Sequence, residues 1–464
     1  MPTPPRPLTL RAVLPGVILS LTALGCRANQ DKDAADTGGV MDVGALELPD
    51  LTGMNIVFVH ADTLRADHFP LWGYERMTTP NISAREWLQV DGIYGASSWT
   101  VPSTSALLTA NPPDVSGLTE LNEDAGDTYL PLNVPTVAQH LQSLGWATGD
   151  FSGNVWVAER TDMVLGFDIV NHTEKDNTKY NLLTLVDAAL PWVDALPEEQ
   201  PFFLFLQPMD MHEPYWADPA HRGYWGEPPP PWNLDEMNHD AQNEEIRQAF
   251  RANEAATTQA LIDVYDEELI GLDSGVEALL DGLEARGLLD HTLFVLGADH
   301  GETLNDAGDT SYGHSRWLRE ELVKNPYLLR FPGMEAGLIP CVAPNMDLIP
   351  TFLEALGVPA MPDTLGASLA SGCHPWAIQT LYSSPTVLDS VNASDGKYRY
   401  LRDCENHQDA GYDLTSDPTQ QSPLDVDSLP HAAGMRADIE ATVERITATF
   451  PDSHCEANRS SGGA

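Results

Sequence analysis

Short, continuous runs of apolar residues alternate along the chain with longer segments of helical spacing. The runs at 55–61, 202–206 and 291–297 have no polar alternation, which is typical of parallel strands buried on both faces. Helical spacing occurs at 134–144 and over the longer segment 244–286. Strands that alternate with helices predict an α/β fold, with a mostly parallel central sheet and helices on both of its faces.

The pattern changes after about residue 375. Short strand-like pieces at 379–382 and 398–401 lie between turn residues, and a helical segment follows at 435–450. We therefore expect a main domain over 54–375 and a small C-terminal α+β subdomain over 376–464. A chain of 464 residues is long enough for both.

The first residues predict an export signal. A basic start precedes an apolar run at 12–24, which is too short to span a bilayer. The run ends in Ala23-Leu-Gly-Cys26, which resembles a bacterial lipobox, although Leu more usually occupies the Ala23 position. An ordinary secretory signal is the alternative, and both predict export.

The preferred interpretation is a lipoprotein signal peptide over 1–26, with Cys26 as the lipidated residue. Residues 27–53 are rich in Asp, Ala and Gly and predict a disordered acidic tether. The protein would then be attached to the membrane of the bacterial cell envelope by its lipid anchor, on the periplasmic or extracellular face.

Four cysteines remain if Cys26 carries a lipid. An even number in an oxidising compartment predicts disulfides, and four cysteines allow three pairings among which the sequence does not choose. A cysteine zinc site is the alternative, but no CxxC spacing is present. The four are Cys341, Cys373, Cys404 and Cys455.

The chain is strongly acidic, with 24 Lys and Arg against 69 Asp and Glu and a formal net charge of −45. This balance argues against nucleic acid as a partner, because the phosphate backbone requires a basic surface. It would also repel an anionic ester, so a site for such a substrate needs its own positive charge. A bound metal ion is the simplest source of that charge. Solubility or a salty habitat is the alternative explanation of the acidity.

Acidic and histidine residues follow two of the predicted strands. Asp62 comes directly after the first strand, and Asp299 and His300 follow the strand at 291–297. Because active sites of open α/β sheets lie beyond the carboxyl ends of the strands, these side chains are candidates for one metal site. A capping aspartate followed by a packed histidine is the alternative at 299–300.

Thr100 lies in a third polar cluster. Pro102 and Ser103 suit the first turn of a helix that runs through Leu108, which places Thr100 just ahead of the helix N-terminus. Free amides and the helix dipole favour an anion there. A threonine hydroxyl becomes a useful nucleophile when a metal lowers its pKa. The alternative is a simple N-cap.

Three further polar residues follow strands or loops of the predicted sheet. His212 and His314 are able to contact a tetrahedral anion or to protonate a leaving oxygen, and Asn154 is able to donate a hydrogen bond to a substrate. A lone histidine is more often structural.

In their order along the chain, these motifs resemble those of the sulfatase family, within the alkaline phosphatase superfamily. The resemblance covers about residues 54 to 420. The motifs are Asn55-Ile-Val-Phe-Val-His-Ala-Asp-Thr-Leu-Arg-Ala-Asp-His, Ser98-Trp-Thr-Val-Pro-Ser-Thr-Ser, Met209-Asp-Met-His-Glu-Pro-Tyr, Ala298-Asp-His-Gly-Glu, Gly313-His and Tyr412-Asp-Leu-Thr-Ser-Asp-Pro.

The resemblance implies an alkaline-phosphatase-like fold and an ester hydrolase that forms a covalent intermediate on its nucleophile. It implies one divalent metal ion held by Asp62, Asp299 and His300, with Thr100 as both nucleophile and fourth ligand. The sequence does not choose among Ca²⁺, Mn²⁺, Mg²⁺ and Zn²⁺, although His300 favours an ion other than Ca²⁺. The remaining implied residues are His212 and His314 in catalysis and Asn154, Thr104 and Arg65 in substrate binding.

Three positions depart from the family pattern. Sulfatases carry Cys or Ser in place of Thr100, which is oxidised to formylglycine, and threonine does not give that aldehyde. They also carry Arg in place of Thr104 and a further Asp in place of Thr63, so positive charge and one ligand are missing. We therefore expect no formylglycine.

The expected substrate is a small molecule, glycan or lipid that carries an anionic sulfate or phosphate ester. The missing aldehyde favours phosphorus, while the family resemblance favours the sulfatase assignment. Two alternatives remain: an envelope phosphotransferase similar to phosphoethanolamine transferases, and an inactive homologue that binds anions.

Overall fold

A computed structural model describes residues 46–121, 129–131, 133–172, 180–216, 218–226, 230, 232–234, 238–451, 453 and 455. The predicted signal peptide over 1–26, with Cys26, and the first part of the predicted tether lie outside the described residues.

Residues 46–51, the last part of the predicted tether, pack against the domain. The amide of Leu46 donates to the carbonyl of Leu369 at 3.0 Å, and that of Leu51 donates to the carbonyl of Ala355 at 2.8 Å. Leu51 is 2% exposed. Apolar side chains in 46–51 find a partner surface, and burial of these side chains explains why this stretch packs against the domain.

The main sheet confirms the mostly parallel arrangement. Among the described residues it has eight strands in the order β10-β2-β9-β6-β1-β5-β3-β4, and β9 alone runs antiparallel to its neighbours. The strands are β1 (Asn55–Ala61), β2 (Leu88–Tyr94), β3 (Ala147–Ser152), β4 (Ile169–His172), β5 (Phe202–Gln207), β6 (Thr292–Ala298), β9 (Lys324–Arg330) and β10 (Gly337–Pro344).

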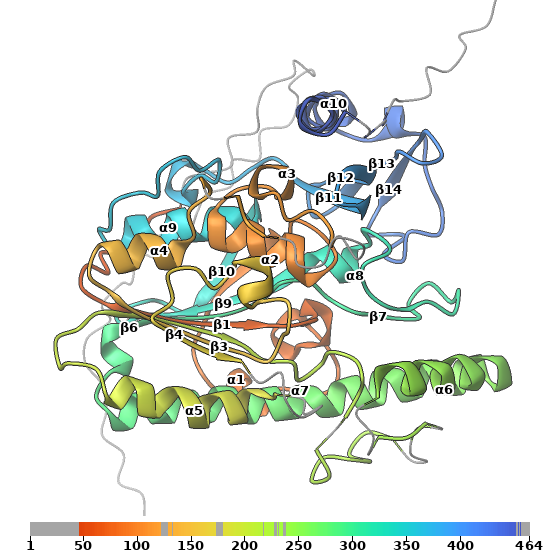
Figure 1. The fold of residues 1–464 in the computed structure, drawn as a ribbon. Helices are drawn as coiled ribbons and strands as arrows, with labels where there is room; N and C mark the ends of the chain where they lie inside the picture. The colour runs from red at the N-terminus through yellow and green to blue at the C-terminus, as the bar shows by residue number, and fades with distance from the viewer. Residues whose placement is uncertain are drawn as a thin grey trace, which may run out of the picture. The chain divides into compact units, whose positions relative to one another are not determined.

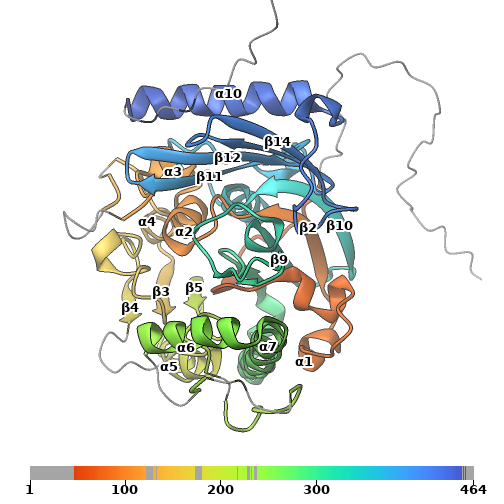
Figure 2. The ribbon, with the colours of Figure 1, turned by 90° about the vertical axis from the view of Figure 1, so that its right-hand side faces the viewer.

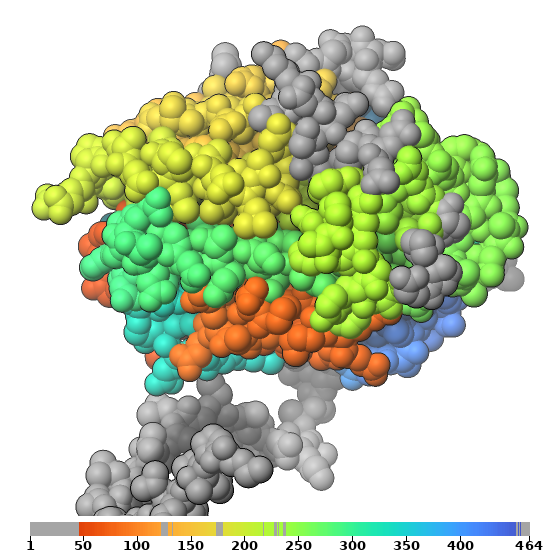
Figure 3. Space-filling model, turned by 90° about the horizontal axis from the view of Figure 1, so that it is seen from below, coloured from red at the N-terminus to blue at the C-terminus, as the bar shows by residue number. Residues whose placement is uncertain are grey.

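Helices cover both faces of this sheet, as the alternation of strands and helices predicted. In Figure 1, α2, α4 and α9 lie on one face and α5 and α7 on the other. Seen from below, the segments around α1, α7 and α5 lie side by side (Figure 3). The helices are α1 (Pro80–Ser83), α2 (Thr100–Thr109), α3 (Pro113–Ser116), α4 (Val137–Ser143), α5 (Leu182–Asp194), α6 (His239–Ala252), α7 (Glu254–Ala285), α8 (Glu320–Val323) and α9 (Leu348–Ala355).

The long helical segment predicted at 244–286 is two helices rather than one. Asn253 has an extended backbone between α6 and α7, and its side chain accepts a hydrogen bond from the amide of Ala256 at 3.3 Å. Asn is a favoured N-cap because it satisfies a free amide at the start of a helix. The apolar spacing continues across the break, which is why the pattern alone did not show it.

A small antiparallel sheet forms the C-terminal part of the fold, as the sequence predicted. Its order is β11-β12-β13-β14, and α10 (Ala432–Thr449) lies across it on the side away from the main sheet (Figure 2). The strands are β11 (Ala377–Ser384), β12 (Val387–Ser394), β13 (Tyr398–Asp403) and β14 (Gln408–Asp413), and a separate short hairpin is β7 (Thr303–Leu304) with β8 (Tyr312–Gly313).

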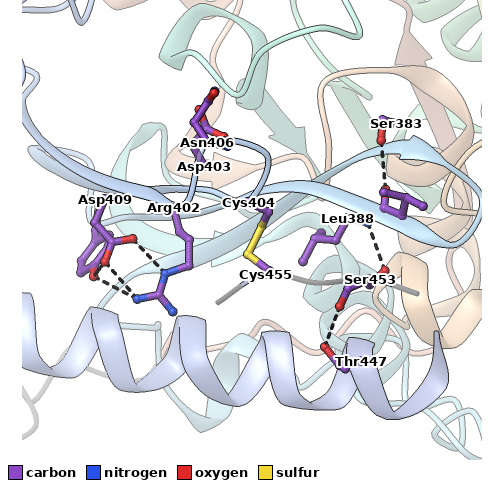
Figure 4. Close-up of a disulfide and its surroundings, with 12 residues drawn as sticks. Ser383, Leu388, Arg402, Asp403, Cys404, Asn406, Asp409, Thr447, Ser453 and Cys455 are labelled. Carbon is purple, nitrogen blue, oxygen red and sulfur yellow. Dashed lines mark hydrogen bonds and ion pairs between the residues drawn. A yellow bond between two sulfur atoms is a disulfide. The ribbon is translucent and has the colours of Figure 1, made fainter. Parts of the chain in front are cut away.

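Two disulfides confirm the expectation for the four cysteines and select one of the three pairings. Cys341 on β10 bonds Cys373, which precedes β11. Cys404 bonds Cys455, and this bridge lies between the small sheet and the segment after α10 (Figure 4). Within the described residues, the helices are all too short or too polar to cross a membrane.

Candidate functional site

Two strands of the main sheet bring the predicted metal ligands together. β1 and β6 pair in parallel with Ala61 opposite Ala298, so the residues that follow, Asp62 and Asp299, leave the sheet side by side. One ligand atom from each of Asp62, Asp299 and His300 lies within 4.8 Å of the others. All three side chains are fully buried. The three side chains therefore lie together at the carboxyl edge of the sheet, as their positions directly after the two strands predicted.

The charge and hydrogen bonding of this group fit a divalent cation. Burial, and after it the negative charge of Asp62, raise the pKa of Asp299 well above its usual value. Asp62 Oδ1 is buried without a hydrogen-bond partner among the described residues. Two buried carboxylates side by side repel each other unless a cation or a proton lies between them.

The tautomer of His300 also fits a metal ligand. Its Nδ1 lies 2.9 Å from the carbonyl oxygen of Gly301, which only accepts hydrogen bonds, so Nδ1 carries the proton. The lone pair then lies on Nε2, which faces Asp62 and Asp299 at 3.5 Å each. A backbone carbonyl that fixes the other ring nitrogen is typical of metal-ligating histidines.

Thr100 places its hydroxyl against this group. Its Oγ1 lies 3.4 Å from Asp62 Oδ2 and 3.3 Å from His300 Nε2. Thr100 is the first residue of α2 rather than the residue before it, and Trp99 is the N-cap without a side-chain cap. The hydroxyl is therefore not used as a capping group, and it remains available to the site.

Asn154 connects the nucleophile candidate to Asp62. Its Nδ2 donates to Asp62 Oδ2 at 2.6 Å and to Thr100 Oγ1 at 3.2 Å. Its Oδ1 accepts a hydrogen bond from the amide of Trp156 at 2.7 Å, which fixes the orientation of the side-chain amide. Asn154 thus orients the hydroxyl as well as facing the site.

His212 and His314 lie together beside the ligand group. The ring of His314 is 4.6 Å from that of His300 and 4.9 Å from that of His212, measured between centroids. Burial lowers the pKa of His314, but the carboxylates of Glu302 and Glu213 outweigh it and raise that pKa to about 9. Nδ1 of His314 lies 3.2 Å from Glu302 Oε1. A cationic imidazole at this place supplies positive charge to an otherwise acidic protein.

The side chains of Thr104 and Arg65 make no hydrogen bond or ion pair with Thr100 or with the metal-ligand group. Thr104 lies one turn along α2, fully buried, with Oγ1 3.4 Å from Nε2 of His60. The Arg65 guanidinium is 2% exposed and pairs with Asp67 at 2.7 Å and with Asp306 at 2.8 Å. A guanidinium held by two carboxylates orders the neighbouring loops, and the structure gives it no contact with Thr100 or the ligand group.

Thr63, in the position of the family's further aspartate, has a strained backbone. Its φ of 55° is in the left-handed region, which is costly for a β-branched residue. Its amide donates to Asp299 Oδ1 at 3.3 Å, and its carbonyl accepts a hydrogen bond from the Tyr265 hydroxyl at 2.7 Å. These contacts hold the turn after β1 so that Asp62 faces Asp299.

Gln207 is a site residue that the sequence reasoning missed. It ends β5, the other neighbour of β1, and its Nε2 donates to Asp299 Oδ2 at 3.2 Å. Its Oε1 is buried without a hydrogen-bond partner among the described residues. The signal was present, because Gln207 is the polar residue directly after the apolar run at 202–206. The same rule that selected Asp62 and Asp299 would have selected it.

The comparison with known families agrees with this geometry. A family model described as Sulfatase matches residues 54–358, which is more than half of the 464-residue chain. The chain belongs to the sulfatase family. The matched region contains every site residue described above, and it stops short of the small C-terminal sheet.

Individual sulfatases and related hydrolases share part of the sequence or the fold. The chain is 34% identical over 107 residues to an N-acetylglucosamine-6-O-sulfatase of Bacteroides thetaiotaomicron, a match that covers 23% of this chain and only 19% of that protein. A structure determined in complex with its substrate D-glucosamine-2-N,6-O-disulfate superposes with a TM-score of 0.67 at 18% identity, over 86% of this chain and 98% of that one. The phosphonate monoester hydrolase of Agrobacterium radiobacter gives a TM-score of 0.65 at 14% identity, over 85% and 96%. At these identities the structural matches show the sulfatase fold alone.

Proposed function

We propose that this protein is a metal-dependent hydrolase of sulfate or phosphate esters that uses Thr100 as its nucleophile. The observation that carries the proposal is the position of the Thr100 hydroxyl, within 3.4 Å of Asp62 and 3.3 Å of His300. A divalent ion held by Asp62, Asp299 and His300 would lower the pKa of this hydroxyl and offset the charge of an anionic ester.

The side chains around Thr100 have defined roles in this reaction. Asn154 and Asp62 orient the hydroxyl, which gives its proton to Asp62 as its oxygen attacks sulfur or phosphorus and forms a covalent ester on Thr100. The bond to the leaving oxygen breaks, and His212 or His314 gives that oxygen a proton. Water then attacks the Thr100 ester and gives one proton to this histidine, the free sulfate or phosphate leaves, and Thr100 recovers its proton from Asp62.

An activity panel tests this proposal. An aryl sulfate, a phosphate monoester and a phosphodiester are offered to the wild type and to Thr100→Ala, each loaded in turn with Ca²⁺, Mn²⁺, Mg²⁺ or Zn²⁺. We expect turnover of at least one ester by the wild type and a loss of about 10³-fold or more in Thr100→Ala. Unchanged turnover in the variant would show that Thr100 is not the nucleophile, and alcohol release without free sulfate or phosphate would indicate a transferase.

We further propose that the protein is exported and attached to the cell envelope through Cys26. The two disulfides support an oxidising compartment, because such bonds persist mainly outside the cytoplasm. The test compares the membrane and soluble fractions of cells that express the wild type or Cys26→Ser. We expect the wild type in the membrane fraction and the variant in the soluble fraction, and equal distribution would refute the anchor.

A further inference from the structure

A cavity of about 640 Å³ opens beside His212 and His314. Trp156 lines one part of it, and the segment 310–317 lines another. The two histidines belong to both the site and the cavity, so the cavity adjoins the site at these two rings.

Hydrogen bonds connect both parts of the cavity wall to residues close to Thr100. The amide of Trp156 donates to Asn154 Oδ1 at 2.7 Å, and the amide of Ser315 donates to the carbonyl of Ser98 at 3.0 Å. Ser315 has a φ of 68°, a left-handed conformation that is uncommon for a residue other than glycine. Such strain persists where the surroundings hold it, and it fixes the direction of the chain at Arg316.

Arg316 is the unusual side chain of this cavity. It is exposed, and within the described part of the chain it has no hydrogen-bond or ion-pair partner. The other described arginines each contact a carboxylate, a carbonyl or an aromatic ring. They are Arg65, Arg76, Arg85, Arg160, Arg222, Arg247, Arg251, Arg286, Arg319, Arg330, Arg399, Arg402, Arg436 and Arg445. The chain has a net charge of −45, yet the Arg316 guanidinium lies beside the site without a carboxylate partner. It is therefore able to bind an anion from outside the protein.

The acids of the cavity do not neutralise Arg316. Glu213 Oε1 lies 2.7 Å from Nε2 of His239, and Asp240 lies 3.7 Å from the other nitrogen of the same ring. Glu213 has a pKa lowered to about 2, because hydrogen bonding and the charges of the surrounding histidines outweigh its burial. Both acids are thus directed to His239, and the charge of Arg316 remains for a ligand.

Two aromatic rings limit the remaining shape of the cavity. The guanidinium of Arg160 lies over the ring of Trp156 at 4.2 Å, and that of Arg319 lies over the ring of Trp317 at 4.7 Å. An arginine that covers one face of an indole holds the ring in place and adds positive potential.

We propose that Arg316 binds a second anionic group, located on the part of the substrate that leaves as the alcohol. The preferred substrates then carry the reactive ester and, on the same ring or its neighbour, a carboxylate, sulfate or phosphate. This inference rests on the proposed function, because it places the reactive ester at Thr100. It makes Arg316 a specificity residue that touches the substrate but not the reacting atoms.

A pair of matched esters tests the inference. The first is the nitrophenyl ester that the wild type hydrolyses, and the second is the same ester with an additional carboxylate on the ring. We expect Arg316→Ala to raise the KM of the carboxylated ester by about 5- to 10-fold without changing its kcat, as for one charge-assisted contact near solvent. The plain ester keeps its wild-type KM, and Arg316→Lys retains part of the preference. The control is Arg251→Ala, which removes an exposed arginine of α6 that does not line the cavity.

A binding measurement separates this inference from the proposed function. Calorimetry with the Thr100→Ala protein and with the double variant Thr100→Ala/Arg316→Ala reports the affinity for the carboxylated ester without turnover. Equal affinity in the two proteins overturns the inference, and so does an equal effect of Arg316→Ala on both esters. Absence of turnover by the wild type for every ester overturns the proposed function, while the affinity difference still reports on Arg316.

Discussion

Arg399 and Glu320 form a largely buried ion pair that joins the small C-terminal sheet to the segment 315–320, which ends at the first residue of α8. The Arg399 side chain is 1% exposed, and its guanidinium also donates to the carbonyl of Leu318 at 2.6 Å. The Tyr94 hydroxyl donates to the other oxygen of Glu320 at 2.9 Å. This segment follows His314 by a few residues. The C-terminal sheet therefore supports the loop that carries a histidine of the site.

Removal of Arg399 should destabilise the protein strongly. Arg399→Met leaves Glu320 without its cationic partner, and breaking a buried pair in this way costs about 3–5 kcal/mol in the free energy of unfolding. Urea denaturation measures the change. Arg251→Met is the control, because its pair with Glu244 is exposed on both side chains and should contribute little to the free energy of unfolding. Similar losses in the two variants would show that the Arg399 pair has no special role.

Loss of the metal ligand Asp299 should raise the stability of the metal-free protein and lower the stability gained on adding metal. In the metal-free protein, Asp299→Asn removes one of two adjacent buried carboxylates, so we expect a higher melting temperature than for the metal-free wild type. With metal added, the wild type should gain about 2.7 kcal/mol at a concentration 100 times its Kd, and the variant should gain little. Calorimetry with and without a chelator measures both. A variant that is less stable under both conditions would contradict the like-charge argument.

The fold class and the central site followed from rules about strands and their ends. Asp62 and Asp299 were selected because each follows an apolar run, and the pairing of β1 with β6 places them side by side. Gln207 satisfies the same rule and was overlooked because an amide is a weaker metal ligand than a carboxylate. The break at Asn253 was missed because the apolar spacing continues across it, and the packing of residues 46–51 was missed because tertiary contacts decide it.

Other features depended on contacts that no local pattern contains. The role of Arg65 followed from the family resemblance, but Asp306, far along the chain, holds its guanidinium. The disulfide pairing was open among three possibilities until the distances between β10, β11 and α10 were known. A sequence shows which side chains are able to do chemistry, whereas the fold decides which of them are already occupied.

The pair of His374 and Asp347 should make stability depend on pH. A hydrogen bond that Nε2 of His374 donates to Asp347 Oδ2, at 2.6 Å, raises the pKa of His374 above its ordinary value of 6.5. Because the folded state binds this proton more tightly, the pair contributes stability fully below the ordinary pKa and loses it as pH rises through the folded pKa. The melting temperature of the wild type should therefore exceed that of His374→Gln at about pH 6, and the difference should shrink toward about pH 9. A difference that grows with pH would refute the assignment.

Gly95 should be required for the position of Asp299. A Cβ at Gly95 would lie 2.6 Å from the carbonyl oxygen of Asp299, 2.9 Å from Ser103 Oγ and 3.0 Å from Asn325 Nδ2. Ser103 and Asn325 donate to that same carbonyl at 2.6 and 2.9 Å, so the side chains and the backbone have little room to yield.

We expect Gly95→Ala to displace the Asp299 carbonyl, weaken metal binding by about 10-fold or more, and lower the free energy of unfolding by about 1–3 kcal/mol. Gly337→Ala is the control, because a Cβ there meets no atom within 4 Å. Metal titration and urea denaturation of both variants give the comparison. If Gly95→Ala binds metal as tightly as Gly337→Ala, the backbone after β6 is able to shift without moving its ligands, and the site is less rigid than its hydrogen bonds indicate.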